Sequence, residues 1–284
     1  MDYQIILVYC LCADLLNALQ HKEDSQCQMS DAEVMTAGLV AALYFGGKHK
    51  LACTFLQEQR YIPKMVSKSQ FSRRLQRLDY LFLTLFRVLG ESFKELNDES
   101  VYIIDSAPIA VCDNIRIRRN KIYGDEEHRG YQASKKRYFY GVKIHLLVTK
   151  DHQPVEFFIS PGAFSDTEGL TQFDFDLPEG AQIFADKAYT YYLVEDLLDE
   201  AGIHLAPDRK KNSKRPMPPW LHFFLRQYRN QVETAGSLIE RLLPKTSASS
   251  VEPSIHAVTA KGFELKVILF VLASSINCLG STMS

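Results

Sequence analysis

The 284-residue sequence lacks several features that would narrow its function at once. It has no internal repeat and no low-complexity stretch, and its 46% hydrophobic and 24% charged residues are ordinary for a folded protein. Its longest apolar runs, at 5–13 and 267–279, predict neither a signal peptide nor a membrane span. The first has no basic residue before it, and the second is short and interrupted. We expect a cytoplasmic protein in which both runs form buried helices.

Cysteine is scarce, and its pattern indicates no metal site. None of the six cysteines stands in a Cys-x-x-Cys pair, and their spacing matches no common zinc site. In a cytoplasmic protein, cysteines of this kind are expected to be reduced and packed.

An excess of basic charge is also absent. The 33 Lys and Arg residues against 34 Asp and Glu residues give a formal net charge of −1, so total charge does not indicate a nucleic-acid partner. Affinity for phosphate depends on where the charges lie, so local patterns must decide the question.

The first hundred residues predict helices. Ser30 and Glu33 form a capping-box pattern, and the helix that follows should end at Gly46 and Gly47. Residues 67–89 predict one or two further helices, which carry the basic residues Lys68, Arg73, Arg74 and Arg77. A basic helix after a turn suits the DNA major groove, although a solvated surface has the same pattern. We predict a helical, DNA-binding domain at 1–97.

From residue 98 onward, strands alternate with helices. Strands are expected at 101–105, 138–149, 154–160, 181–185 and 203–206, and helices from 166 and at 189–201, 223–243 and 261–278. Three antiparallel strands followed by two crossover strands make the ribonuclease H topology. We therefore predict an α/β fold, a ribonuclease H-like mixed sheet with flanking helices, for a catalytic domain at 98–284.

Two aspartates, Asp105 and Asp186, end predicted strands of this sheet. Ligands of open α/β sheets collect at the carboxyl ends of strands, and Mg²⁺ and Mn²⁺ prefer oxygen ligands. Glu233, on the helix at 223–243, could supply a third carboxylate. Such a set can hold two ions that act on the attacking and leaving oxygens of a phosphodiester. Each aspartate alone could equally be a helix cap or turn residue.

The third acid has a competitor in Glu240. It lies seven residues after Glu233, on nearly the same face of the predicted helix. Arg229 lies one turn before Glu233 and can orient it, which favours Glu233. Otherwise, Arg229 forms only a surface ion pair of little energetic value.

Basic residues interleaved with tyrosines fill residues 116–143, next to Asp105, and a second basic cluster follows the strand at 203–206. Basic side chains neutralise phosphates, and tyrosines can stack on unpaired bases. The alternative is a pair of solvated loops, and the acidic residues at 125–127 favour it in part. The predicted DNA contacts are Arg116, Arg118, Arg119, Lys121, Arg129, Lys135, Lys136, Arg137, Lys143, Lys187, Arg209, Lys210, Lys211 and Arg229.

His145 shares a strand face with Lys143. Hard cations prefer oxygen, so a packed or DNA-facing histidine is expected there rather than a metal ligand.

The motifs resemble those of bacterial insertion-sequence DDE transposases, most closely the IS982-like family within the IS4/IS5-type superfamily. The resemblance rests on Asp105-Ser106 and residues 107–112, Gly130-Tyr131, Ser134-Lys135, the stretch from Tyr140 to His145, Asp186-Lys187-Ala188-Tyr189, and Arg229 with Glu233. The sequence departs from the family at Gln132, where a cysteine is frequent, and in a thinner His/Arg run near its C-terminus.

This resemblance implies a DNA transposase that cleaves at element ends and joins them to target DNA. Two Mg²⁺ or Mn²⁺ ions would be held by Asp105, Asp186 and Glu233. The implied partners are the terminal inverted repeats, target DNA and a second copy of the chain, with no membrane. The alternatives are a ribonuclease H-like DNA nuclease without strand transfer, and an inactive domesticated DNA-binding protein.

Overall fold

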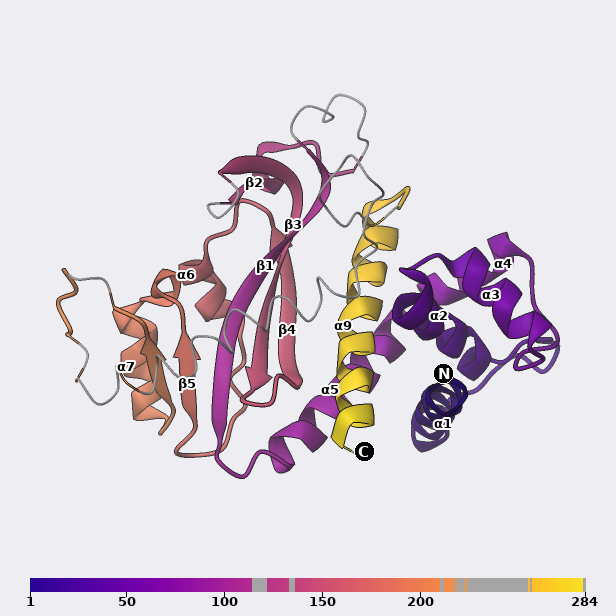
Figure 1. Cartoon of the computed structure of the whole chain (residues 1–284), viewed down its shortest axis with the longest axis horizontal. Coiled ribbons are helices and arrows are strands. Elements are labelled where there is room, and N and C mark those ends of the chain that lie inside the picture. Colours follow the sequence, from indigo (N-terminus) through magenta and orange to yellow (C-terminus); the bar gives the residue numbers. More distant parts are fainter. Residues whose placement is uncertain are drawn as a thin grey trace. The chain divides into compact units, whose positions relative to one another are not determined.

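The computed structural model describes residues 1–113, 122–132, 136–209, 212–216, 218, 223, 255 and 257–282. Contacts divide the chain into two compact units (Figure 1). Residues Met1–Val88 and Arg241–Ser284 form the helical unit, and Leu89–Glu240 form the sheet unit. The boundary falls inside helix α5 (Asp79–Glu95), which therefore contributes residues to both.

The helical unit contains α1 (Asp2–Ala18), α2 (Asp31–Phe45), α3 (His49–Glu58), α4 (Lys68–Arg77), the first part of α5, and α9 (Ala260–Thr282). Its central helix is α2, which contacts α1, α3, α4 and α9. The predicted capping box is present, with Ser30 and Glu33 each bonded to the other's backbone. Gly46 ends the helix in a left-handed conformation, as glycine does most easily.

Helix α9 belongs to the helical unit, whereas the predicted domain boundary at 97/98 places it in the catalytic domain. It packs on α2 and α4 in the helical unit. Phe263, Val267, Phe270 and Leu272 are each at most 1% exposed, because a helix that is apolar all round must be covered. Ala260–Gly280 is long and apolar enough to span a membrane, but 61% of the window that qualifies is buried within the protein, as in a core helix.

One mixed sheet forms the sheet unit. It contains β1 (Val101–Asp113), β2 (Arg129–Gln132), β3 (Arg137–Thr149), β4 (Pro154–Pro161), β5 (Gln182–Ala185) and β6 (His204–Pro207). Strands β1, β3 and β4 are antiparallel, and β5 and β6 run parallel to β1. The order β4-β3-β1-β5-β6 confirms the predicted ribonuclease H topology, with β2 added beside the start of β3.

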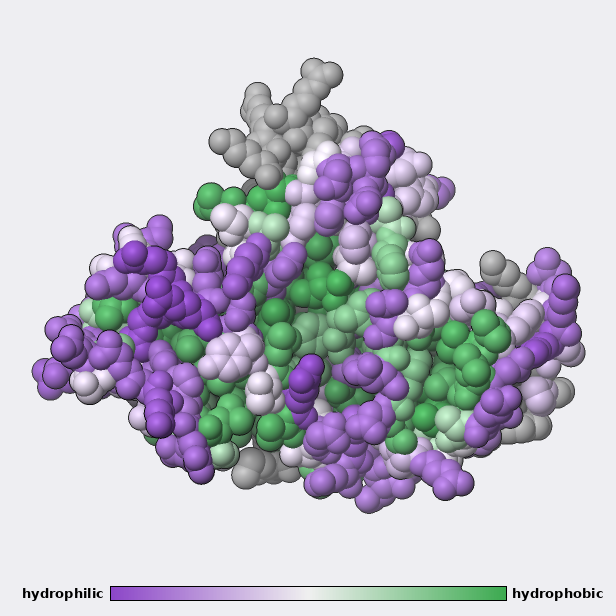
Figure 2. Space-filling view, turned by 180° about the vertical axis from the view of Figure 1, so that it is seen from behind, coloured by the Kyte–Doolittle hydropathy of each residue, from purple (hydrophilic) through white to green (hydrophobic). Residues whose placement is uncertain are grey.

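Short elements connect these strands. They are η2 (Glu126–His128), α6 (Asp166–Gly169), η4 (Leu170–Gln172), η5 (Lys187–Tyr189) and α7 (Tyr192–Glu200). The second half of α5 lies close to β4, because a Cβ added at Gly90 would come 2.7 Å from the Val155 carbonyl oxygen. On the face seen in Figure 2, hydrophobic residues are visible in patches between hydrophilic ones.

Three predicted boundaries differ from the structure. Strand β1 continues eight residues beyond Asp105, to Asp113, since Ala107 and Ile109 keep burying every second side chain. The helix predicted from 189 begins at Tyr192, after the separate turn η5. Strand β2 lies between residues 105 and 138, where the sequence predicts no strand.

Candidate active site

Asp105 and Asp186 emerge side by side from adjacent parallel strands. The register pairs Ile104 of β1 with Ala185 of β5, and each aspartate directly follows its paired residue. Equivalent register positions on parallel strands place side chains on the same face of the sheet, about 4.8 Å apart at the backbone. The sheet therefore brings together the two acids that the sequence predicted.

Local hydrogen bonds orient each carboxylate. Asp105 is half-buried, and its Oδ1 accepts the Ser106 N–H at 2.8 Å. Asp186 is exposed and caps η5 by accepting the Lys187 N–H at 2.7 Å. Asp186 therefore has the capping role that is common for an aspartate at the end of a strand. It also lies next to Asp105.

Tyr189 is a buried tyrosine close enough to the two acids to feel their charge. The turn η5 folds back so that the Tyr189 N–H donates to the Asp186 carbonyl at 3.0 Å, and the side chain is only 1% exposed. Burial, followed by the charges of Asp166 and Asp105, raises the Tyr189 pKa well above its usual value; Ser106 opposes this and Asp186 adds to it. The hydroxyl makes no hydrogen bond of normal geometry in the described part of the chain, although Ser106 lies close.

A third carboxylate near this hydroxyl, Asp166, has a role that the sequence analysis missed. The Ser106 hydroxyl donates to Asp166 Oδ1 at 2.7 Å, and Lys143 Nζ donates to the same oxygen at 3.1 Å and to the Phe164 carbonyl at 2.7 Å. Asp166 begins α6, as predicted, behind a capping box formed by Ser165 and Glu168. The sequence predicts a helix from 166 but gives no sign of contact between Asp166 and Ser106.

The third parallel strand also ends in an acid. Ala185 pairs with Pro207, and the Asp208 N–H that follows donates to the Ala185 carbonyl at 2.9 Å. The Asp208 carboxylate pairs with Lys187 Nζ at 3.1 Å. The strand-end rule that identified Asp105 and Asp186 applies equally to Asp208, so the sequence could have revealed it.

His145 is packed, one of the two roles expected for it. It is 0% exposed, its Nε2 lies 3.0 Å from Ser160 Oγ, and its ring stacks on Phe158 at 4.4 Å. Burial lowers its pKa to about 4; Asp166 opposes this shift and Lys143 adds to it.

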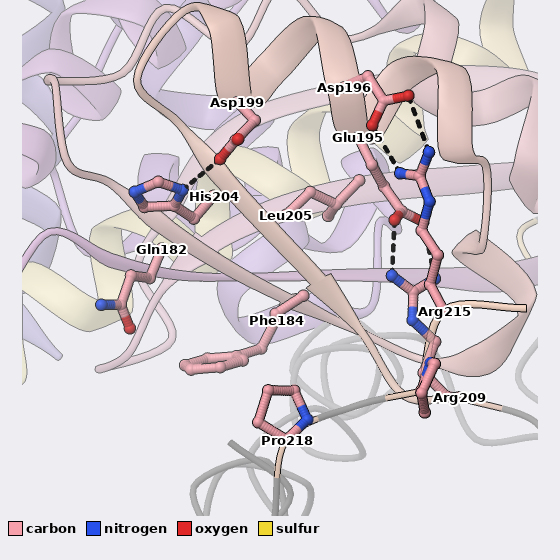
Figure 3. Close-up of a pocket in the computed structure, with 12 residues that line it drawn as sticks. Gln182, Phe184, Glu195, Asp196, Asp199, His204, Leu205, Arg209, Arg215 and Pro218 are labelled. Carbon is pink, nitrogen blue, oxygen red and sulfur yellow. Dashed lines mark hydrogen bonds and ion pairs between the residues drawn. The ribbon is translucent and has the colours of Figure 1, made fainter. Parts of the chain in front are cut away.

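Two residues of the second basic cluster, Arg209 and Arg215, border a cavity of about 570 Å³ between β5, β6 and α7 (Figure 3). Arg209 binds Glu195 through two hydrogen bonds, at 2.8 and 2.6 Å. Arg215 binds Asp196 in the same way, at 2.6 and 3.0 Å. Arg209 therefore points at a carboxylate of its own chain, and its predicted DNA contact stays a prediction.

Of the first basic cluster, the structure describes Arg129 on β2, Lys136 directly before β3, and Arg137 and Lys143 on β3. The Arg129 guanidinium lies 4.4 Å from the centre of the Tyr138 ring, and the rings of Tyr131 and Tyr138 are 4.9 Å apart. The predicted site residues that lie outside the described residues are Arg116, Arg118, Arg119, Lys121, Lys135, Lys210, Lys211, Arg229 and Glu233, together with the competing Glu240.

In the helical unit, one of the predicted basic residues of α4 binds groups within the unit. Arg74 pairs with Asp31 and with the Met29 carbonyl, whereas Lys68, Arg73 and Arg77 are exposed.

Comparison with solved structures gives low identities. The piggyBac transposase in a synaptic complex with hairpin DNA is 10% identical, covers 98% of this chain and 75% of its own, and has a TM-score of 0.47. The Mos1 chain from a pre-cleavage transpososome is 10% identical, with coverages of 92% and 81% and a TM-score of 0.24. At these scores, neither likeness by itself establishes a shared fold.

A search of curated proteins finds no match. The family model described as the transposase DDE domain matches residues 96–245, which is more than half of the chain. The match includes the six strands of the described residues, with Asp105, Asp186, Asp208 and Tyr189. The chain therefore belongs to the transposase DDE domain family, and its function is that of a DNA transposase.

Proposed function

We propose that this transposase cleaves a phosphodiester at each end of its element and joins the freed 3′-hydroxyl to target DNA, with Asp105, Asp186 and Glu233 as metal ligands. The main support is the register of β1 and β5, which sets Asp105 and Asp186 side by side on one face. We also propose that it is an IS982-like transposase of the cytoplasm that works as a homodimer, because two element ends must be held together.

The described residues fit the divalent ions that a DDE domain implies. Asp105 and Asp186 offer only oxygen donors, and Asp186 is exposed and hence accessible. Lys143 and Lys187 pair with Asp166 and Asp208, so each is occupied by another carboxylate. Two bound Mg²⁺ or Mn²⁺ ions would lower the pKa of the attacking oxygen and stabilise the leaving oxygen.

The contribution of the chain itself is a rigid pair of carboxylates. Strand β1 is held on both sides, by β3 and β5, and Asp186 is fixed as the cap of η5. Carboxylates held in place before substrate binds need little rearrangement when charge develops at the phosphate. Glu233 is our third ligand because Arg229 precedes it by one turn, and Glu240 is its competitor.

We propose that DNA runs along the extension of β1 and β3 beyond Asp105. The eight residues 106–113 reach about 26 Å at 3.3 Å per residue. That length corresponds to roughly eight base pairs. Arg137 and the exposed Tyr138 lie at the start of β3, directly after Lys136, and Arg129 and the exposed Tyr131 lie on β2, which pairs with this part of β3. The predicted contacts Arg116, Arg118, Arg119, Lys121, Lys135, Lys210, Lys211 and Arg229, and the exposed basic residues of α4, would bind further phosphates of the terminal repeat or target.

The test uses the full chain, a pre-cleaved element end, an uncleaved end and a target plasmid, with Mg²⁺ present. We expect Asp105→Asn and Asp186→Asn each to reduce cleavage and joining on the order of 10³-fold or more, while DNA binding in a gel-shift assay is retained. Glu233→Gln should behave likewise, and Glu240→Gln should not. Asp151→Asn, at an exposed turn residue between β3 and β4, is the matched control.

Full activity in the Asp105 and Asp186 variants would refute this site. Metal-dependent cleavage without any joined product would favour the nuclease alternative. Binding of DNA with no cleavage by the natural sequence would favour the inactive DNA-binding alternative.

A further inference from the structure

Asp166 is a carboxylate that the proposed metal set does not use. Its side chain is 23% exposed, and that of its partner Lys143 is 17% exposed. Its Oδ1 accepts two hydrogen bonds, from the Ser106 hydroxyl at 2.7 Å and from Lys143 Nζ at 3.1 Å. An oxygen that already has a hydroxyl and an ammonium donor is poorly available to a metal ion.

Both of these contacts lead to the strand pair that carries Asp105. Ser106 follows Asp105 in β1, and Lys143 lies opposite Pro108 in β3. The Ser106 side chain donates to Asp166, while its backbone N–H donates to Asp105 Oδ1 at 2.8 Å. One residue therefore connects the two carboxylates, and its orientation affects both.

The short helix α6 is also fastened to the turn that carries Asp186. The Thr167 hydroxyl donates to the Ala188 carbonyl of η5 at 2.9 Å. On its other side, α6 packs tightly on β3, because a Cβ added at Gly169 would lie 2.8 Å from His145 Nδ1. Asp166 thus lies on a segment that contacts the elements of both strand-end acids.

We propose that Asp166 is a positioning residue of the transposase site. Through Ser106, it holds Asp105 in the orientation that binds metal, and the attachment of α6 to η5 keeps Asp186 in register with it. Lys143 compensates the charge of Asp166, so this carboxylate supports the site without adding to its net negative charge. The inference rests on the metal site of the proposed function.

The test compares Asp166→Ala, Asp166→Asn, Ser106→Ala and the double variant Asp166→Ala/Ser106→Ala in the full chain. Two quantities are measured: the rate of DNA cleavage as a function of Mn²⁺ concentration, and Mn²⁺ binding to the protein alone by calorimetry. Changes to residues that orient metal ligands typically cost 10–100-fold in affinity or activity. We expect Asp166→Ala to lose that much at limiting Mn²⁺, to recover in part at high Mn²⁺, and to bind DNA normally.

Asp166→Asn keeps an oxygen that can accept from Ser106, so it should retain more activity than Asp166→Ala. If Asp166 acts through Ser106, the double variant should be no worse than Asp166→Ala, because the two changes remove one interaction. Asp176→Ala, at a carboxylate that is 86% exposed, is the control. If Asp166→Ala does not fold, the same comparison is made with Asp166→Asn, Ser106→Ala and the double variant Asp166→Asn/Ser106→Ala.

Additive losses, or an unchanged Mn²⁺ dependence in every Asp166 variant, would overturn the proposal. A loss as complete as that of Asp105→Asn, with fewer Mn²⁺ ions bound per chain, would overturn it in favour of direct ligation. If the natural sequence cleaves no DNA, the proposed function fails, whereas calorimetry still measures the effect of Asp166 on Mn²⁺ binding.

Discussion

The two arginine–carboxylate pairs beside the cavity have similar geometry and different burial. The side chains of Arg209 and Glu195 are 14% and 7% exposed, whereas those of Arg215 and Asp196 are 47% and 55% exposed. A buried ion pair leaves a desolvated charge behind when one partner is removed, but an exposed pair is replaced by water. At the residue scale, burial therefore decides which of these pairs matters for stability.

We predict that Glu195→Ala lowers the free energy of unfolding by about 3 kcal/mol, because Arg209 then stays buried without its carboxylate. Asp196→Ala should change it little, and it is the matched control on the same helix. Urea unfolding followed by circular dichroism measures both. If Glu195→Ala and Asp196→Ala lowered the free energy of unfolding equally, burial would not determine how much each ion pair contributes to stability.

At the scale of elements, a half-buried histidine, His49, begins α3 and lies within reach of the charge of Lys266 on α9. Burial lowers the pKa of His49 to about 4, and the charge of Lys266 on α9 adds to the shift. Its Nε2 has no hydrogen-bond partner within the described residues, and its ring meets Phe71 edge-on at 5.6 Å. The neutral form of His49 is therefore the one that the packed helices accept.

This pKa shift predicts that acid weakens the helical unit. The pKa of His49 is lower in the folded state than its unfolded value of 6.5, so above pH 6.5 the residue is neutral in both states and costs no stability. As the pH falls from 6.5 toward 4, the unfolded state binds the proton more tightly, and the folded state loses stability. The loss is at most about 3.5 kcal/mol, at about 1.4 kcal/mol per pKa unit. His49→Gln should reduce the fall in the free energy of unfolding between pH 6.5 and 4, measured by urea unfolding at each pH. If the substitution leaves that pH dependence unchanged, the dependence comes from other groups, such as His145.

At the scale of the whole molecule, the chain forms two units, and its last described helix returns to the first of them. Phe270 of α9 is 1% exposed in the helical unit, and Phe184 of β5 is 2% exposed in the sheet unit. Each unit therefore has an aromatic side chain whose removal should affect its own core.

We predict that Phe270→Ala and Phe184→Ala each cost about 3–5 kcal/mol. Hydrogen exchange should then differ between them. Phe270→Ala should speed amide exchange in α1–α4 and α9, and Phe184→Ala should speed it in β1, β5 and β6. Faster exchange in the sheet for Phe270→Ala would instead favour the original boundary at 97/98, with α9 as part of the catalytic domain.

Much of this molecule is determined by local sequence. The capping box at Ser30 set the start of α2, period-two burial set the strands, and the order of the strands gave the ribonuclease H topology. Asp105 and Asp186 were found because each follows a short apolar run, and a parallel sheet brings such positions to one edge. These inferences need only the period of side-chain direction and the rules of strand connection.

The tertiary structure alone decided the contacts between residues far apart in the chain. Asp166 meets Ser106 across 60 residues, and Arg209 meets Glu195 across 14. From its residue type alone, Asp166 could equally be a solvated carboxylate, and Arg209 could equally bind DNA. The helix α9 joined the helical unit for a related reason: a helix that is apolar on every side reveals that it is buried, but not which core buries it.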